Sequence, residues 1–536
     1  MRKGTRNLAN NDVLLRRATQ EAARSKAKNA SLIRRILPPV LVFALAVSVY
    51  SQYGLSAELG GTNGIDLYSG QRMAEGIPHY VSIFDIITPL GPMLAGVGVM
   101  ISKQLGWSDI YTARLLFFLL GCCAVVSVYL LGNGLFRSQR VGVFAALTFL
   151  GFFGFAEEIA RGPYHKVPMV LFAVLSLFFT SQRRWFLAGL CGSLSFLLWQ
   201  PTVIFPLVTL FLATMQHRDT RPATTVRALL GTGLPLVAVG AYFYHYNAFH
   251  KLLDGSFLFH VFYGDRGEVT LDSSYLLSHF SAPVKTTFEG YPTMIPAILV
   301  GLVVVVYTVF SRWARHRTFR DVLVQDTFAP ILLSLPALVL WSLIDFQNKK
   351  DFFVFLPYAA IGFGRFLDLT VRQIQKSKGA ALSVGAQRIL ILGMCLFLGG
   401  LALANESIGT TDTTMEDLRE LYDQQRQAAM EIEDRFGHNA KLVALGAPDL
   451  LALQHRTNPT PYAFFDKGID NHIHANTPGG FKGWIRELEA YDPDVIVRGS
   501  KLSGSHEPEL KEWLESNSHE EQVGPWTLYI KNSIDE

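Results

Sequence analysis

Two carboxylates follow the first apolar stretch of the chain, in a segment rich in glycine and aromatic residues. Asp66 lies in GTNGIDLYSG and Asp85 in SIFDIITPLGP. A carboxylate within hydrogen-bond reach of a hydroxyl can take its proton as the oxygen attacks. Acids beside a bilayer-length stretch tend to be functional rather than merely solvated, so we take Asp66 as the general base. Asp85 is a second candidate for base, acceptor or metal binding, or it caps the helix that follows.

A second charged segment, FAEEIARGPYHKVP, lies between two later apolar stretches. Its cations are Arg161, His165 and Lys166, which suit the binding and stabilisation of a phosphate group. We assign the neighbouring Glu157 and Glu158 to substrate binding. The alternative is that these charges only fix the ends of the flanking helices.

A third segment, IDFQNKKDFF, carries the pair Lys349 and Lys350. The topology below places the pair on the outer side, against the usual charge bias of membrane proteins. We therefore expect a second set of phosphate contacts here, with snorkelling membrane anchors as the alternative.

The composition indicates a membrane protein that holds these residues between its spans. Half of the 536 residues are hydrophobic and 17% are charged, against roughly 25% charged in soluble proteins. Apolar runs approach the ~20 residues that cross a bilayer. The eleven predicted spans are 36–54, 109–132, 141–156, 167–180, 185–199, 202–215, 226–246, 293–311, 328–344, 352–369 and 389–404.

The distribution of Lys and Arg sets the predicted orientation. Ten of them precede residue 36, which places the basic tail 1–35 in the cytoplasm. The loops that then face the cytoplasm hold 15 Lys or Arg in 55 residues, whereas the opposite loops hold 9 in 119. This bias holds only if the apolar run 86–103 does not span, so we expect an interfacial helix in the outer loop 55–108. The C-terminus is then outside.

The composition changes after residue 404, where the predicted spans end. Residues 411–436 have a helical pattern with Thr414 as a candidate cap. Four apolar segments follow that are predicted to be short strands separated by helical or turn stretches: KLVALGA, PYAFF, DVIVRG and WTLYIK. The chain is thus predicted to be an all-α polytopic domain over 36–404 with a small extracytoplasmic α/β domain over 405–536.

Several kinds of chemistry have no support in the sequence. The four cysteines lie inside apolar segments without CxxC spacing, so neither a disulfide nor a metal framework is expected. There is no Walker loop or dinucleotide-binding motif in a suitable context. Nucleic-acid binding has no support beyond the loop charges.

Taken together, these segments resemble the GT-C superfamily of polyprenyl-phosphate-sugar-dependent glycosyltransferases. The similarity is to the family of dolichyl-phosphate-mannose protein mannosyltransferases and bacterial aminoarabinose transferases. It runs through IDLYSGQRMAEGIPHYVSIFDIITPLGP, ARLLFFLLGCCAVVSVYLLGNGLF, DFFVFLPY and WIRELEAYDPDVIV. The chain departs from the family pattern in having Ile87 and Thr88 where Lys is common, and Lys166 where many members carry an acid.

The resemblance implies a plasma-membrane enzyme that moves a sugar from a polyprenyl phosphate to a glycan, lipid or protein acceptor. Asp66 would be the base of a single inverting displacement, with Tyr68 matching a family aromatic near the substrate. It implies no obligatory cofactor, and it leaves the sugar, the acceptor and divalent metal dependence open. A secondary transporter and a non-catalytic membrane scaffold are the alternatives; the first normally shows two related halves.

Overall fold

The structure is a computed structural model that describes most of the chain. It describes residues 36–216, 219–263, 281, 285, 291–316, 318–344, 346, 349–377, 384–408, 414–465, 468–499 and 504–532. The predicted basic tail 1–35 lies outside these ranges.

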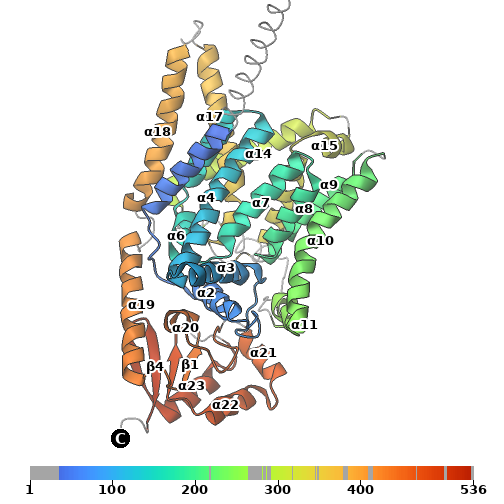
Figure 1. The fold of residues 1–536 in the computed structure, drawn as a ribbon. Helices are drawn as coiled ribbons and strands as arrows, with labels where there is room; N and C mark the ends of the chain where they lie inside the picture. Colours follow the sequence, from blue (N-terminus) through green and yellow to red (C-terminus); the bar gives the residue numbers. More distant parts are fainter. Residues whose placement is uncertain are drawn as a thin grey trace, which may run out of the picture.

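A bundle of apolar helices forms the larger part of the molecule (Figure 1). An N-terminal helix, Ile36–Ser51, enters it. The helices that follow are α4 (Asp109–Phe136), α5 (Gln139–Leu150), α6 (Phe153–Arg161), α7 (Lys166–Ser181), α8 (Trp185–Phe196), α9 (Ile204–Thr214), α10 (Arg221–His245), α14 (Ile295–Trp313), α15 (Phe319–Gln325), α16 (Ala329–Ser342), α17 (Leu356–Ser377) and α18 (Val384–Ile408). Short helical turns join them at α11 (Phe249–Leu253), α12 (Phe259–Phe262), η1 (Gln200–Val203), η2 (Asp254–Leu258), η3 (Pro292–Met294) and η4 (Asp351–Val354).

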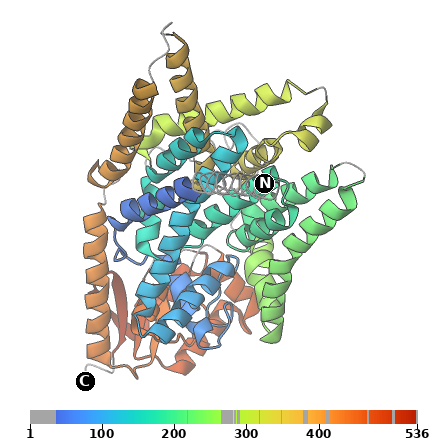
Figure 2. The same ribbon diagram turned by 45° about the horizontal axis from the view of Figure 1, so that its top comes forward.

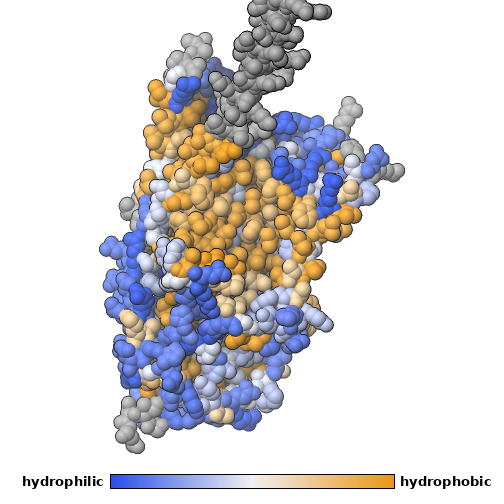
Figure 3. All heavy atoms as spheres, in the orientation of Figure 1, coloured by the Kyte–Doolittle hydropathy of each residue, from blue (hydrophilic) through white to orange (hydrophobic). Residues whose placement is uncertain are grey.

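The surface of this bundle is that of a multi-pass membrane protein. Hydrophobic side chains form a continuous band over the bundle, whereas the part built by the end of the chain is mostly hydrophilic (Figure 3). Among the described residues, four helices are long and apolar enough to cross a membrane alone: α4, α10, α14 and residues 385–404 of α18. Two bent pairs, α5 with α6 at 62° and α15 with α16 at 112°, raise this to six. Each of the eleven predicted spans overlaps a helix, although 141–156 runs across the bend between α5 and α6. Their number as membrane crossings remains a prediction.

Two helices of the predicted outer loop lie between the bundle and the C-terminal domain (Figures 1 and 2). These are α2 (Gly61–Ala74), which carries Asp66, and α3 (Leu90–Leu105). They cross closely because Gly70 meets the backbone of Gly96, where a Cβ on Gly70 would lie 2.7 Å from the Gly96 nitrogen. The predicted interfacial helix 86–103 corresponds to α3.

The C-terminal domain has a four-stranded sheet with the order β1-β2-β4-β3. Its elements are α19 (Met415–Phe436), β1 (Leu442–Leu445), α20 (Pro448–Gln454), α21 (Ile469–Asn476), α22 (Gly480–Tyr491), β2 (Val495–Arg498), α23 (Glu507–Asn517), β3 (Ser518–Val523) and β4 (Trp526–Lys531). β1 runs parallel to β2, and the other pairs are antiparallel. Thr414 caps α19 in a capping box with Asp417, as predicted.

One strand prediction was wrong. The segment PYAFF, residues 461–465, is not a strand; the carbonyl of Pro461 instead accepts a 2.6 Å hydrogen bond from the Phe84 N–H of the outer loop. The strand that was missed is β3, whose sequence SHEEQV is polar because it forms an edge of the sheet with partly exposed side chains.

The sheet packs directly on the helix that carries Asp66. Alternate residues of β1 and β2, with Leu450 of α20, share a hydrophobic core with Ile65 and Tyr68 of α2. Gly64 of α2 lies against α20 so closely that a Cβ there would be 2.8 Å from the Asp449 nitrogen. The fold of the end of the chain therefore fixes the position of α2.

Candidate active site

Asp66 is buried and is held by the turn that precedes α7. Its Oδ2 accepts a 3.0 Å hydrogen bond from the backbone N–H of His165 and lies 3.3 Å from His165 Nδ1. Burial and the nearby charge of Asp85 raise the pKa of Asp66 well above its usual value. Burial, together with Lys166, lowers the pKa of His165 to about 3, so its imidazole is neutral at physiological pH.

A glycine makes this contact possible. Gly91, at the start of α3, lies against both partners; a Cβ there would be 2.7 Å from His165 Cβ and 3.0 Å from Asp66 Oδ1. No side chain fits at this point without displacing the pair.

Asp85 is buried close to Asp66 and has its own histidine. Its Oδ2 lies 3.4 Å from His79 Nε2, and the other ring nitrogen of His79 is 2.6 Å from Ser69 Oγ. Asp85 Oδ1 accepts a hydrogen bond from its neighbour Ile86. The alternative that Asp85 caps the following helix was wrong, because α3 begins at Leu90, five residues later, and has no side-chain cap.

The two glutamates of α6 lie in a cluster with three predicted phosphate-binding cations. Arg161 contacts Glu157 at 3.1 Å and Glu158 at 3.9 Å. Lys349 pairs with Glu157 at 3.1 Å, and Lys350 pairs with Glu158 at 2.8 Å. These five predicted site residues are brought together, and Glu58, 3.0 Å from Arg161, balances the third cation. None of the five lines the cavity described next.

Lys166 is one of two predicted phosphate-binding residues that reach a cavity. It is buried, forms an ion pair with Asp351 of η4, and lies 4.6 Å from the centre of the Trp199 ring. His165 lines the same cavity, and its Nε2 has no hydrogen-bond partner in the described part of the chain.

The cavity has a volume of about 550 Å³, and its lining has both polar and apolar parts. Polar side chains line part of it, and aromatic and aliphatic ones line the rest. The lining residues are Thr62, Ile65, Ile86, Ile87, Tyr164, His165, Lys166, Trp199, Gln200, Pro201, Ser256, Phe257, His260, Val261, Trp341, Asp351 and Phe464. They come from α2, the outer loop, several bundle segments and, through Phe464, the C-terminal domain.

Gln200 and His260 line one side of the cavity and are not among the predicted site residues. Gln200 Nε2 donates to the Ile86 carbonyl at 2.7 Å, and His260 Nε2 lies 2.8 Å from the same oxygen. Trp199 ends the predicted span 185–199 and Gln200 follows it, so an aromatic and a polar residue at a span end were the available signal.

Tyr68 faces away from this cavity. Its hydroxyl accepts a 3.2 Å hydrogen bond from the Asn458 N–H of the C-terminal domain, and it is not among the lining residues. The contact gives Tyr68 a role in joining α2 to that domain. Across the described ranges no group of three His, Cys, Asp or Glu residues is arranged to hold a metal ion.

An apolar helical bundle, two helices of an acidic loop at its end and a C-terminal α/β domain together form a fold that solved protein structures share. The particular structures it resembles are those of ArnT, an aminoarabinose transferase, from Cupriavidus metallidurans. The apo structure is 13% identical, with a TM-score of 0.59, over 91% of this chain and 97% of that chain. The structure bound to undecaprenyl phosphate is 14% identical, with a TM-score of 0.50 and the same coverage. No family model matches the chain, and no curated protein sequence does.

Proposed function

We propose that this protein is a membrane glycosyltransferase that takes its sugar from a polyprenyl-phosphate carrier. The observation that carries the proposal is the cavity at the end of the bundle, which joins the His165–Asp66 pair and Lys166 to an apolar wall. Its mixed lining suits a donor with an anionic phosphate and an isoprenoid chain. The ArnT structure bound to undecaprenyl phosphate supports the same class of ligand.

In the proposed reaction an acceptor hydroxyl attacks the anomeric carbon of the sugar. A new carbon–oxygen bond forms as the bond to the phosphate oxygen breaks, and the polyprenyl phosphate leaves with the electron pair. The hydroxyl proton passes to the Asp66–His165 pair, in which Asp66 is the base and His165 lines the cavity. Lys166, which also pairs with Asp351, supplies a positive charge beside the leaving phosphate.

The membrane placement belongs to the same proposal. The N-terminus lies in the cytoplasm, the C-terminal domain lies outside the plasma membrane, and transfer takes place on the outer side. The charge bias of the loops supports this orientation. The sugar and the acceptor, whether glycan, lipid or protein, stay open.

The test is transfer of a labelled sugar from a synthetic polyprenyl-phosphate donor by the full-length protein in proteoliposomes. Wild type is compared with Asp66→Asn, His165→Gln and Asp85→Asn. We expect loss of turnover in the first two variants. Absence of transfer from every such donor, with a folded wild-type protein, would favour the transporter or scaffold alternatives.

A further inference from the structure

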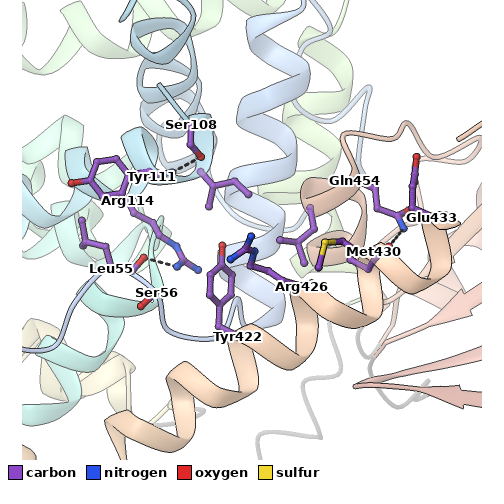
Figure 4. Close-up of a pocket in the computed structure, with 13 residues that line it drawn as sticks. Leu55, Ser56, Ser108, Tyr111, Arg114, Tyr422, Arg426, Met430, Glu433 and Gln454 are labelled. Atoms are coloured by element: carbon purple, nitrogen blue, oxygen red, sulfur yellow. Dashed lines mark hydrogen bonds between the residues drawn. The ribbon is translucent and has the colours of Figure 1, made fainter. Parts of the chain in front are cut away.

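A second cavity, of about 640 Å³, lies where α19 passes the first turns of α4 (Figure 4). It is separate from the candidate active site and shares none of its lining residues. Residues of the N-terminal segment, α4, α19 and α20 line it. They are Leu55, Ser56, Ser108, Ile110, Tyr111, Arg114, Tyr422, Arg426, Ala429, Met430, Glu433, Leu453 and Gln454.

The start of α4 indicates where this cavity lies relative to the membrane. That helix is the longest of those able to cross a membrane on their own, and it begins at Asp109. Trp107 is 53% exposed and Tyr111 is 48% exposed on either side of this start. Exposed Trp and Tyr at the end of a span mark the layer of lipid headgroups. The cavity therefore opens at the level of lipid phosphates.

The charge of the cavity is positive. Arg426 of α19 points into it beside Tyr422 (Figure 4) and forms no ion pair with a carboxylate in the described part of the chain. Arg114 supplies a second guanidinium, which donates to the carbonyls of Leu55 and Ala57 and lies 4.3 Å from the Tyr422 ring. Among the described residues, neither guanidinium is paired with an acid.

The single acid of the lining is already neutralised. Glu433 Oε2 lies 3.1 Å from Arg456 Nη2, and its Oε1 lies 2.7 Å from His438 Nδ1. An anion that enters the cavity therefore meets the two guanidinium groups without an opposing free carboxylate.

The cavity lining also includes Gln454, whose side-chain oxygen is a hydrogen-bond acceptor without a donor among the described residues. Gln454 donates from Nε2 to the Ala429 carbonyl at 2.7 Å, which fixes the orientation of its amide. Its Oε1 is buried and has no partner among the described residues. A buried acceptor of this kind favours a ligand that brings a hydroxyl or ammonium group.

We propose that this cavity binds the headgroup of a phospholipid of the membrane leaflet that α4 enters at Asp109. The phosphate lies by Arg426 and Arg114, and a hydrogen-bond-donating group beyond it reaches Gln454. Such a lipid links the end of α4 to α19 and so ties the C-terminal domain to the membrane surface. This inference does not depend on the glycosyltransferase activity.

The test measures binding of dihexanoylphosphatidylglycerol to the full-length protein in a non-ionic detergent, by native mass spectrometry and calorimetry. Inorganic phosphate and the uncharged dihexanoylglycerol are the comparison ligands. We expect saturable binding of the phospholipid and roughly tenfold weaker binding by Arg426→Gln, because a charge-assisted hydrogen bond is lost. Arg435→Gln is the matched control, since Arg435 is in the same helix but pairs with Glu521 outside the cavity.

Location is checked with a photoreactive form of the same lipid, whose cross-links we expect in the peptides around Tyr111 and Arg426. Three results would overturn the proposal: unchanged affinity in Arg426→Gln, an equal loss in Arg435→Gln, or cross-links confined to other surfaces. Equal affinity for inorganic phosphate would also overturn it, because the site would then recognise a free anion rather than a lipid.

Discussion

Asp66 and His165, which are 99 residues apart in sequence, contact each other twice: once through the backbone N–H of His165 and once through its ring. The backbone contact fixes the carboxylate, and the ring contact joins it to a residue that lines the cavity. The pair therefore couples a buried carboxylate to an imidazole that lines the cavity.

Substitution of Asp66 by Asn keeps the shape of the side chain and removes the proton acceptor. We expect turnover to fall by roughly 10²–10⁴-fold, the usual contribution of general base catalysis. His165→Gln should also reduce turnover, because the cavity-lining partner of the acid is lost. Steady-state transfer assays measure the turnover of each variant, with folding checked by size-exclusion profile. Retained turnover in Asp66→Asn together with loss in Asp85→Asn would identify Asp85 as the base instead.

The pH profile reports the interaction between the two acids. Asp66 acts as a base only when ionised, and its pKa is raised by burial and by Asp85. Activity should therefore fall as the pH drops through a value above that of an ordinary aspartate. Asp85→Asn removes the like charge, lowers the pKa of Asp66 and shifts the acidic limb of kcat/KM to lower pH. An acidic limb that stays in place or moves upward contradicts the assignment.

Gly91→Ala tests how closely the pair is packed. The added Cβ would meet His165 Cβ at 2.7 Å and Asp66 Oδ1 at 3.0 Å, so the pair must separate. We expect a large loss of turnover, with a stability cost in the ~1–3 kcal/mol range of overpacked sites. Gly233→Ala is the control, because nothing lies within 4 Å of a Cβ in that position of α10. Equal activity in the two variants would show that the pair tolerates displacement.

If the donor phosphate binds in the cavity, substitutions of Lys166 and Lys349 should have different effects. Lys166 lines the cavity, so Lys166→Gln should raise the KM for the lipid donor. Lys349 pairs with Glu157 outside the cavity lining, so Lys349→Gln should lower thermal stability more than it raises that KM. Donor titrations and thermal unfolding of both variants compare the two effects. A larger rise in KM for the Lys349 variant would place the phosphate in the cation–carboxylate cluster instead.

Gln425 of α19 joins the C-terminal domain to the segment before α2. It bonds both the N–H and the carbonyl of Leu59, at 3.0 and 3.1 Å, and donates to Asp449 Oδ2 at 3.0 Å. Gln425→Leu leaves these buried groups unpaired, at a cost of about 1–3 kcal/mol for each. Thermal unfolding and limited proteolysis of the domain should both show the loss, whereas exposed Gln424→Leu on the same helix should not.

The sequence predicted the elements well and the site only in part. Apolar length and the charge bias of the loops were enough to locate the helices of the bundle, because the bilayer imposes both. The pairing of Asp66 with His165 was not predictable from spacing, since it joins two loops through the fold of the whole bundle. Residue type alone also made Lys349 and Lys350 resemble Lys166; all three pair with an acid, and only Lys166 lines the cavity.

The hydrogen bond from Asn458 to Tyr68 joins residues 390 positions apart. The helix that bears Asp66 is made early in translation, whereas the surface it rests on is made near the end. Ribosomes that stall before residue 458 would thus release chains with a complete bundle but a loosely held α2. In such chains the helix that bears Asp66 would lack the surface that holds this carboxylate beside His165.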